Sequence, residues 1–321
     1  MSLVLKVKYV MKTNEIQIRD PFILKHDNFY YMYGSTDKDI WKSCGTGFDV
    51  YKGKDLENWE GPIHAFRPPV GYWGTKNFWA PEVHKYNGKF FMFATFIADG
   101  YNRGTAILNA DKPEGPFSPW SDGAVTPSDW MCLDGTLYID CENNPWIVFC
   151  HEWVQITDGT VCAAKLSDDL KRRTSEPIVL FKSSSAPWSG TAYSPSNNIK
   201  GHVTDGPFMH RLASGKLIML WSCVGKEGYR LGYAISESND IYGPWTQSGK
   251  PLFDDDGGHG MLFTTFKSES EQRERLFLAV HSPNKTPNER AKFVEVFETE
   301  DGLTCVRPAL VDKHYELPST V

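Results

Sequence analysis

The stretch PFILKHDNFYYMY, residues 21–33, places two short apolar segments on either side of a polar turn. The apolar segments are residues 21–24 and 29–33, and His26, Asp27 and Asn28 lie between them. Apolar runs of this length joined by turn-forming residues are typical of two antiparallel strands. We therefore predict a β-hairpin here.

The same pattern recurs along the chain. Apolar runs follow polar turns at residues 29–33, 90–93, 146–150, 217–221 and 276–280. The turns are residues 26–28, 86–88, 142–144, 213–215 and 270–274, and the strands before them are residues 21–24, 82–84, 136–139, 207–210 and 261–266. The middles of the apolar runs are 61, 56, 71 and 59 residues apart. Since 321 residues divided by five gives about 64, five such units fill the chain.

Each unit has room for two more strands. A third strand is clearest at residues 105–109, 161–166, 231–236 and 293–297, and proline-containing corners at 114–117 and 242–245 lead to a fourth. Four antiparallel strands repeated five times predict an all-β protein, a five-bladed β-propeller in which residues 1–321 form a single domain. A β-sandwich with irregular loops is the alternative, and the regular spacing disfavours it.

Composition excludes several classes of function. The net charge is −6 and the longest basic block is residues 171–173, so no basic stripe for nucleic acid is present. No apolar stretch has the length of a membrane helix. The seven cysteines show no CxxC spacing, which predicts buried thiols rather than disulfides or a zinc site. With no signal-peptide layout in residues 1–10, we expect a cytoplasmic protein.

The residues that open the first strand of each unit are mostly acidic. They are Asp20, Glu82, Asp134, Asp205 and, in the fifth unit, His259. In a propeller these strands surround the axis, so equivalent positions face one another. A single aspartate before glycine or proline is commonest in turns. Four acids at one position instead predict a site, in which crowding raises the pKa of some carboxyl groups.

A carboxylate cluster of this kind suits the cleavage of glycosidic bonds. That reaction needs one carboxylic acid to protonate the leaving oxygen and one carboxylate to activate water. A third carboxylate can keep the acid protonated. Of the aromatic residues near these motifs, Phe78, Trp79, Trp130 and Trp153, we predict substrate stacking only for Trp79, since core packing explains each of them equally well.

Five motifs, taken in order, resemble glycoside hydrolase family 43. They are Arg19-Asp20-Pro21-Phe22, Trp79-Ala80-Pro81-Glu82, Leu133-Asp134-Gly135, Asp205-Gly206-Pro207 and Gly258-His259-Gly260. The resemblance covers essentially the whole chain. It implies a five-bladed propeller and an inverting hydrolase that acts mostly on arabinose- and xylose-containing glycans, of the arabinofuranosidase or xylosidase type.

The resemblance also implies roles for three acids. Asp20 corresponds to the general base, Asp134 to the residue that modulates the acid, and Asp205 to the general acid. The family generally has glutamate at the last position, and a misplacement of about 1 Å can cost roughly 100-fold in rate. Either the pocket is rebuilt around the shorter acid, or another residue donates the proton, or activity is impaired. Glu152 is the first substitute.

His259 resembles the family's axial histidine, which often lies beside a metal ion, typically calcium. Calcium prefers oxygen ligands, so we expect any ion here to be structural and held largely through water, with no cofactor required for the chemistry. Arg290 is a candidate for binding sugar hydroxyls, although a solvated surface arginine is the simpler interpretation.

Two rival functions remain open. They are a carbohydrate-binding propeller that has lost its acid and a hydrolase that retains configuration. We expect an oligo- or polysaccharide partner, and the sugar, the choice of exo or endo action and the oligomeric state stay undetermined.

Overall fold

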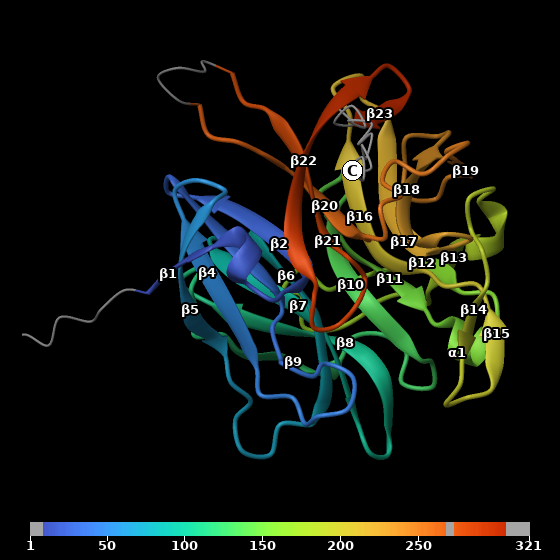
Figure 1. The fold of residues 1–321 in the computed structure, drawn as a ribbon. Helices are drawn as coiled ribbons and strands as arrows, with labels where there is room; N and C mark the ends of the chain where they lie inside the picture. The colour runs from blue at the N-terminus through green and yellow to red at the C-terminus, as the bar shows by residue number, and fades with distance from the viewer. Residues whose placement is uncertain (1–8, 268–272, 306–321) are drawn as a thin grey trace, which may run out of the picture.

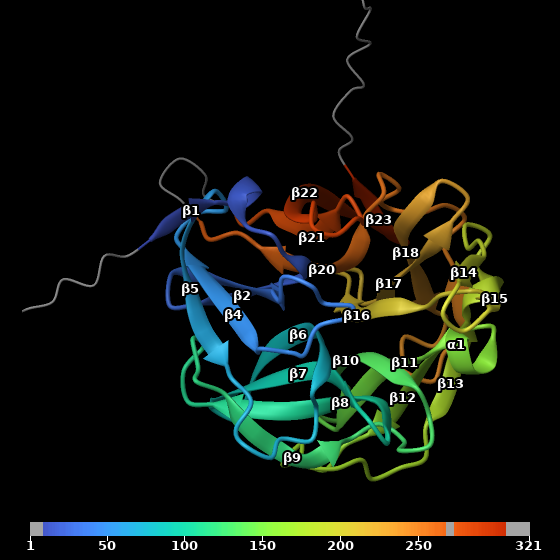
Figure 2. The same ribbon diagram turned by 60° about the horizontal axis from the view of Figure 1, so that its bottom comes forward.

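The computed structural model describes residues 9–267 and 273–305, and these form five antiparallel sheets around a central axis (Figures 1 and 2). The predicted all-β, five-bladed propeller is confirmed. The innermost strands of the blades are β2 (Arg19–His26), β6 (Lys76–Tyr86), β10 (Cys132–Ile139), β16 (Asp205–Arg211) and β20 (Gly258–Thr264). Strand β2 contacts both β6 and β20, which closes the ring between the first and last blades.

The remaining strands complete the blades in chain order. Blade 1 adds β3 (Phe29–Ser35), β4 (Phe48–Gly53) and β5 (Asn58–Phe66), with β1 (Val10–Lys12) paired to its outer edge. Blade 2 adds β7 (Lys89–Ala98), β8 (Tyr101–Ala110) and β9 (Ser118–Ala124), and blade 3 adds β11 (Pro145–His151), β12 (Thr160–Lys165) and β13 (Ile178–Lys182). Blade 4 adds β17 (Leu217–Gly225), β18 (Gly228–Ser236) and β19 (Trp245–Gln247), and blade 5 adds β21 (Leu276–Ser282), β22 (Arg290–Thr299) and β23 (Gly302–Cys305).

The five apolar runs lie where the repeat analysis predicts them, in the second strand of each blade. These strands are almost entirely buried because neighbouring blades cover both of their faces. Four of the seven cysteines are buried in this core, as predicted, whereas Cys44 and Cys141 are exposed and Cys305 is half-buried. The innermost strand of blade 5 ends at Thr264, two residues before its predicted end, and the turn predicted at 270–274 lies partly outside the described residues.

Several short elements lie outside the five blades. A 3-10 turn, η1 (Thr13–Glu15), follows β1, and a second, η2 (Ser183–Ser185), follows β13. The single-turn helix α1 (Trp153–Ile156) contacts the hairpin of β14 (Ala192–Ser194) and β15 (Ile199–Gly201) between blades 3 and 4. Within residues 9–267 and 273–305, no helix is long and apolar enough to span a membrane.

Every innermost strand contains the same backbone irregularity near its start. The strand register skips by one residue there, and one residue of each bulge has a positive φ angle. These residues are Asp20 (φ 54°), Ala80 (φ 47°), Asp134 (φ 57°), Gly206 (φ 52°) and His259 (φ 49°). The bulge turns the side chains of Asp20, Asp134 and His259 toward the axis at equivalent positions.

The bulge corrects the sequence alignment in two blades. Asp205 lies one residue before the equivalent position, and Glu82 lies two residues after it. The Glu82 carboxylate instead contacts Nε2 of His84 at 3.2 Å, within its own strand. The equivalent position therefore carries two acids and one histidine, rather than four acids and one histidine.

Candidate active site

A cavity of about 890 Å³ opens at the axis, above the starts of the innermost strands. Asp20, Asp134, Asp205 and His259 line it together, so the structure brings the predicted acids and the histidine into one pocket. Its wall includes residues from blades 1 to 5 and from the β14–β15 hairpin: Arg19, Ile40, Trp41, Asn77, Trp79, Arg103, Glu152, Trp153, Ala192, Ser194, Val224, Tyr229, Asn284 and Thr286.

Asp20 is held as a buried carboxylate. Its Oδ1 lies 3.3 Å from Nδ1 of His259, and its Oδ2 accepts a hydrogen bond of 2.6 Å from the Ser35 hydroxyl. Burial raises the pKa of Asp20, but the neighbouring His259 and Arg19 side chains and the Ser35 hydrogen bond outweigh burial and lower that pKa to about 2. Asp20 is therefore ionised near neutral pH, as a general base must be.

His281, which the sequence analysis missed, fixes the backbone beneath Asp20. Its Nδ1 accepts a hydrogen bond of 3.2 Å from the Asp20 amide, so its Nε2 carries the proton and donates to Oδ1 of Asn284 at 3.2 Å. Burial, followed by the charge of Arg19, lowers the pKa of His281 to about 3. The ring is neutral, and it holds the strained bulge in place.

Asp134 is buried between the other two acids. Its Oδ2 accepts a hydrogen bond of 3.0 Å from the Gly206 amide and lies 3.6 Å from Nδ1 of His259. Burial and the charge of Asp20 raise the pKa of Asp134 well above its usual value. Asp134 is therefore hydrogen-bonded to Gly206, the residue that directly follows Asp205.

Asp205 has the electrostatics of a proton donor. Burial and the charge of Asp134 raise the pKa of Asp205 to about 7. The hydroxyl of Tyr229 donates a hydrogen bond of 3.1 Å to Oδ2 of Asp205. The Tyr229 ring in turn stacks on His281, with ring centroids 5.5 Å apart and planes 18° apart. Tyr229 thus supports the shorter acid and belongs to the same cluster as Asp20, although no sequence motif marks it.

Glu152, the substitute acid, lines the same pocket but is paired with a cation. Arg103 donates to Oε2 of Glu152 and, at 3.2 Å, to Oδ1 of Asn77. An arginine partner stabilises the carboxylate rather than the acid. Glu152 is therefore ion-paired, whereas Asp205 accepts a hydrogen bond from Tyr229.

The predicted aromatic residues occupy different environments. Trp79 lines the pocket, where its indole nitrogen donates to the Ile40 carbonyl at 2.7 Å and the Arg103 guanidinium lies 4.5 Å from its ring centroid. Trp153 also lines the pocket. Phe78, with 1% of its surface exposed, belongs to the core. Trp130 is outside the pocket lining and stacks on His151 at 4.2 Å.

Besides Tyr229, the sequence analysis missed a second large aromatic side chain of the pocket. Trp41 is 51% exposed, its ring lies 5.2 Å from that of Trp79 in an edge-on arrangement, and its indole nitrogen donates to Thr286 at 3.0 Å. The Arg19 guanidinium lies 5.2 Å from the same ring. Arg19 belongs to the motif Arg19-Asp20-Pro21-Phe22, but the sequence analysis assigned no role to this arginine.

Arg290 lies elsewhere. Its guanidinium donates to the backbone carbonyls of Asn14, Pro287 and Glu289 at 2.8, 3.1 and 2.8 Å, and the residue is absent from the pocket lining. The arginines that do line the pocket are Arg19 and Arg103.

The pocket residues do not form a calcium site made of protein atoms. Nδ1 of His259 faces two carboxylates, which leaves one imidazole nitrogen, and calcium prefers oxygen ligands. Among residues 9–267 and 273–305, no group of three or more histidine, cysteine, aspartate or glutamate side chains is arranged to hold a metal ion. A water-held ion near His259 stays a prediction, and no step of the chemistry below depends on it.

Comparison with known proteins decides the family. The model of glycosyl hydrolases family 43 matches residues 14–303. The chain belongs to this family. The family 43 protein described here is 40% identical to a solved endo-arabinase from Bacteroides thetaiotaomicron, with a TM-score of 0.82 over 91% of this chain and 98% of that one.

Two curated relatives match shorter stretches of this family 43 chain. An extracellular endo-α-(1→5)-L-arabinanase of Bacillus subtilis is 26% identical over 44% of this chain and 45% of its own length. An extracellular exo-α-(1→5)-L-arabinofuranosidase of Cellvibrio japonicus is 24% identical over 49% of this chain and 46% of its own length. The matched regions therefore span about half the length of each relative.

Proposed function

We propose that this protein is an inverting glycosidase that cleaves arabinose-containing glycan chains, with α-1,5-linked arabinan as its first candidate substrate and xylose-containing glycans as the second. One observation carries the proposal. A single pocket holds one carboxyl group whose pKa is lowered to about 2 and another whose pKa is raised to about 7. The names of the relatives support the choice of sugar.

In the proposed reaction, the two acids act on opposite sides of one sugar. The Asp20 carboxylate accepts a proton from a water molecule as the water oxygen bonds to the anomeric carbon. The bond from that carbon to the glycosidic oxygen breaks, and Asp205 gives its proton to the departing oxygen. Water ends as the new hydroxyl of one product, and the proton of Asp205 ends on the other, which is the balance of an inverting hydrolysis.

Asp134 acts on Asp205 rather than on the sugar. Its charge is the largest influence after burial in raising the pKa of Asp205, and it anchors the Gly206 amide next to that acid. Without Asp134, Asp205 would lose its proton at lower pH and would be free to move. We therefore assign Asp134 as the residue that positions the acid and keeps it protonated.

Product stereochemistry tests the proposal directly. The purified protein is incubated with debranched arabinan, with xylan, and with aryl α-L-arabinofuranosides and aryl β-D-xylosides, and the first product formed is followed by proton NMR. We expect cleavage of the arabinose substrates with inversion at the anomeric carbon. Retention would show that Asp20 attacks the sugar instead of activating water, and cleavage of only the xylosides would move the substrate class to xylan.

A non-catalytic carbohydrate-binding propeller is the second candidate, and one observation favours it. Asp205 is one methylene shorter than the glutamate general in the family, and a shift of about 1 Å can cost about 100-fold in rate. Isothermal titration with arabinan oligosaccharides separates the two functions. Heat of binding without any product after prolonged incubation would support the binding protein over the enzyme.

A further inference from the structure

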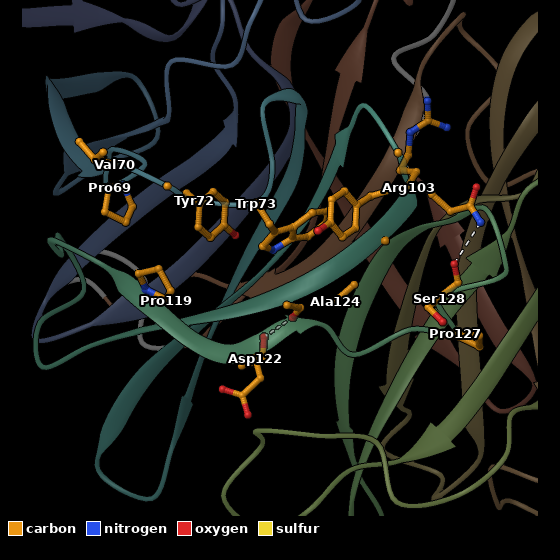
Figure 3. A pocket seen from close by; sticks show the side chains of 17 residues that line it. Pro69, Val70, Tyr72, Trp73, Arg103, Pro119, Asp122, Ala124, Pro127 and Ser128 are labelled. Carbon is orange, nitrogen blue, oxygen red and sulfur yellow. Dashed lines mark hydrogen bonds between the residues drawn. The ribbon is translucent and has the colours of Figure 1, made fainter.

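A second cavity, which we call the blade 2 groove, lies beside the active-site pocket. It has a volume of about 930 Å³ and is bounded by the loop 69–73, the β7–β8 turn with the start of β8, and strand β9 with the residues after it (Figure 3). Its lining residues include Tyr72, Trp73, Tyr101, Asn102, Arg103 and Ser128.

The groove opens on the same end of the propeller as the candidate active site. Lys76, at the start of β6, pairs with Ile97 near the end of β7, and the β7–β8 turn follows directly. Ile97 and Arg103 line the active-site pocket, and Arg103 lines the groove as well. The pocket and the groove therefore share Arg103 in their walls.

The groove wall offers flat apolar faces. The rings of Trp73 and Tyr101 lie 6.1 Å apart, and Tyr101 is 63% exposed. Figure 3 shows Tyr72 and Trp73 in a row that leads toward Arg103, with Pro119 and Ala124 on the facing strand. Exposed aromatic rings beside a cleft are flat surfaces on which a sugar ring can stack.

Polar groups accompany these rings. Asn102 donates to the Ser128 carbonyl at 3.0 Å, which fixes its amide at the groove wall (Figure 3). The buried hydroxyl of Tyr72 interacts with the Trp73 side chain, and the two rings lie 6.1 Å apart, so each fixes the position of the other.

The charge of the groove favours a neutral ligand. Arg103 and Asp122 are the charged side chains among its lining residues, and Arg103 is engaged with Glu152 and Asn77. In Figure 3 the Asp122 carboxylate points away from the row of rings. A neutral polyhydroxylated chain fits this surface better than an anionic one.

We propose that the blade 2 groove binds a distal stretch of the glycan chain whose cleaved bond lies in the active-site pocket. This inference rests on the proposed function, because the same chain occupies both sites. The groove then improves the binding of long chains and contributes nothing to a substrate of one sugar.

A protein strand added to the edge of blade 2 is the competing occupant, and the outer strand is unsuited to it. The β8–β9 register shifts between Ala106 and Leu108, and Gly123 in β9 has a φ angle of 106°. An irregular edge strand of this kind opposes continued strand pairing. The groove is therefore assigned to a glycan.

The test compares a polymer with a single-sugar substrate in the variant Tyr101→Ala. Tyr101 is largely exposed, so the change leaves the fold intact. We expect KM for debranched arabinan to rise by about 3- to 10-fold, the effect of one lost aromatic contact. The kcat/KM for an aryl α-L-arabinofuranoside, which fills only the active-site pocket, should stay at the parent value. Tyr101→Phe keeps the ring and should restore the parent KM.

Tyr242→Ala is the matched control. Tyr242 is 61% exposed and lies in the corner between β18 and β19, at the other end of its blade. Tyr242→Ala should leave the kinetic constants for both substrates at the parent values. Equal kinetics of Tyr101→Ala and the parent on both substrates would overturn the groove assignment while leaving the proposed function intact.

Electrophoresis in native gels that contain arabinan separates the two proposals further, because binding to the polymer slows the protein. If Tyr101→Ala is slowed less than the parent, the result supports the groove even in a protein without turnover. A parent protein that neither cleaves nor is retained by arabinan would overturn both proposals.

Discussion

Removal of the Tyr229 hydroxyl should extend the activity of the enzyme to higher pH. Asp205 must be protonated to act as the acid, so activity is present below its pKa and is lost as the pH rises through that value. The Tyr229 hydrogen bond favours the ionised form of Asp205 and opposes the upward shift caused by burial. Tyr229→Phe removes this bond but keeps the ring that stacks on His281.

The size of the shift follows from the bond that is lost. A hydrogen bond to a charged group contributes about 1.5–3 kcal/mol, which corresponds to about 1–2 pKa units. Because Asp205 is partly exposed to the pocket, water replaces part of the interaction. We therefore expect the basic limb of the kcat/KM profile to move up by about one unit, from about 7 in the parent.

The assay measures kcat/KM between about pH 5 and pH 10 on an arabinoside with a poor leaving group, whose departure requires protonation. Tyr233→Phe is the control, because Tyr233 lies on the same strand with its hydroxyl against Gly302 rather than against the acid. A basic limb that stays in place, or moves to lower pH, in Tyr229→Phe would refute the assignment of Asp205 as the titrating acid.

Three further predictions follow from the assigned roles. Asp20→Asn should fold normally and lower turnover by about 100-fold or more, measured on the best glycoside, and near-normal turnover would remove Asp20 from the mechanism. Asp205→Ala should impair substrates with poor leaving groups far more than activated aryl glycosides, whereas the same signature in Glu152→Gln alone would make Glu152 the donor. If a water-held ion lies near His259, treatment with a chelator should lower activity or Tm, and indifference of both to chelation would count against the ion.

The sequence by itself determined the fold and named the three acids of the pocket, two of them at the correct strand position. Apolar runs such as residues 29–33 and 146–150 are suited to burial on both faces between neighbouring blades, and their regular spacing predicted five blades. Asp20 and Asp134 occupy equivalent positions of their strands, and the motifs around them were sufficient to place both at the axis. The cysteine spacing predicted buried thiols, which was correct for four of the seven and wrong for Cys44 and Cys141, which are exposed.

Tertiary structure alone decided the rest of the site, because a strand bulge leaves no clear mark in a single sequence. The skipped residue shifts the pairing register, so Glu82 and Asp205 do not occupy the position that their motifs suggested. A shift of even one residue reverses the face on which a side chain lies. Contacts between distant segments are equally invisible in the sequence. The bond from Tyr229 to Asp205 forms across three strands of blade 4, and the bond between His281 and Asp20, 261 residues apart, exists because the ring of blades closes.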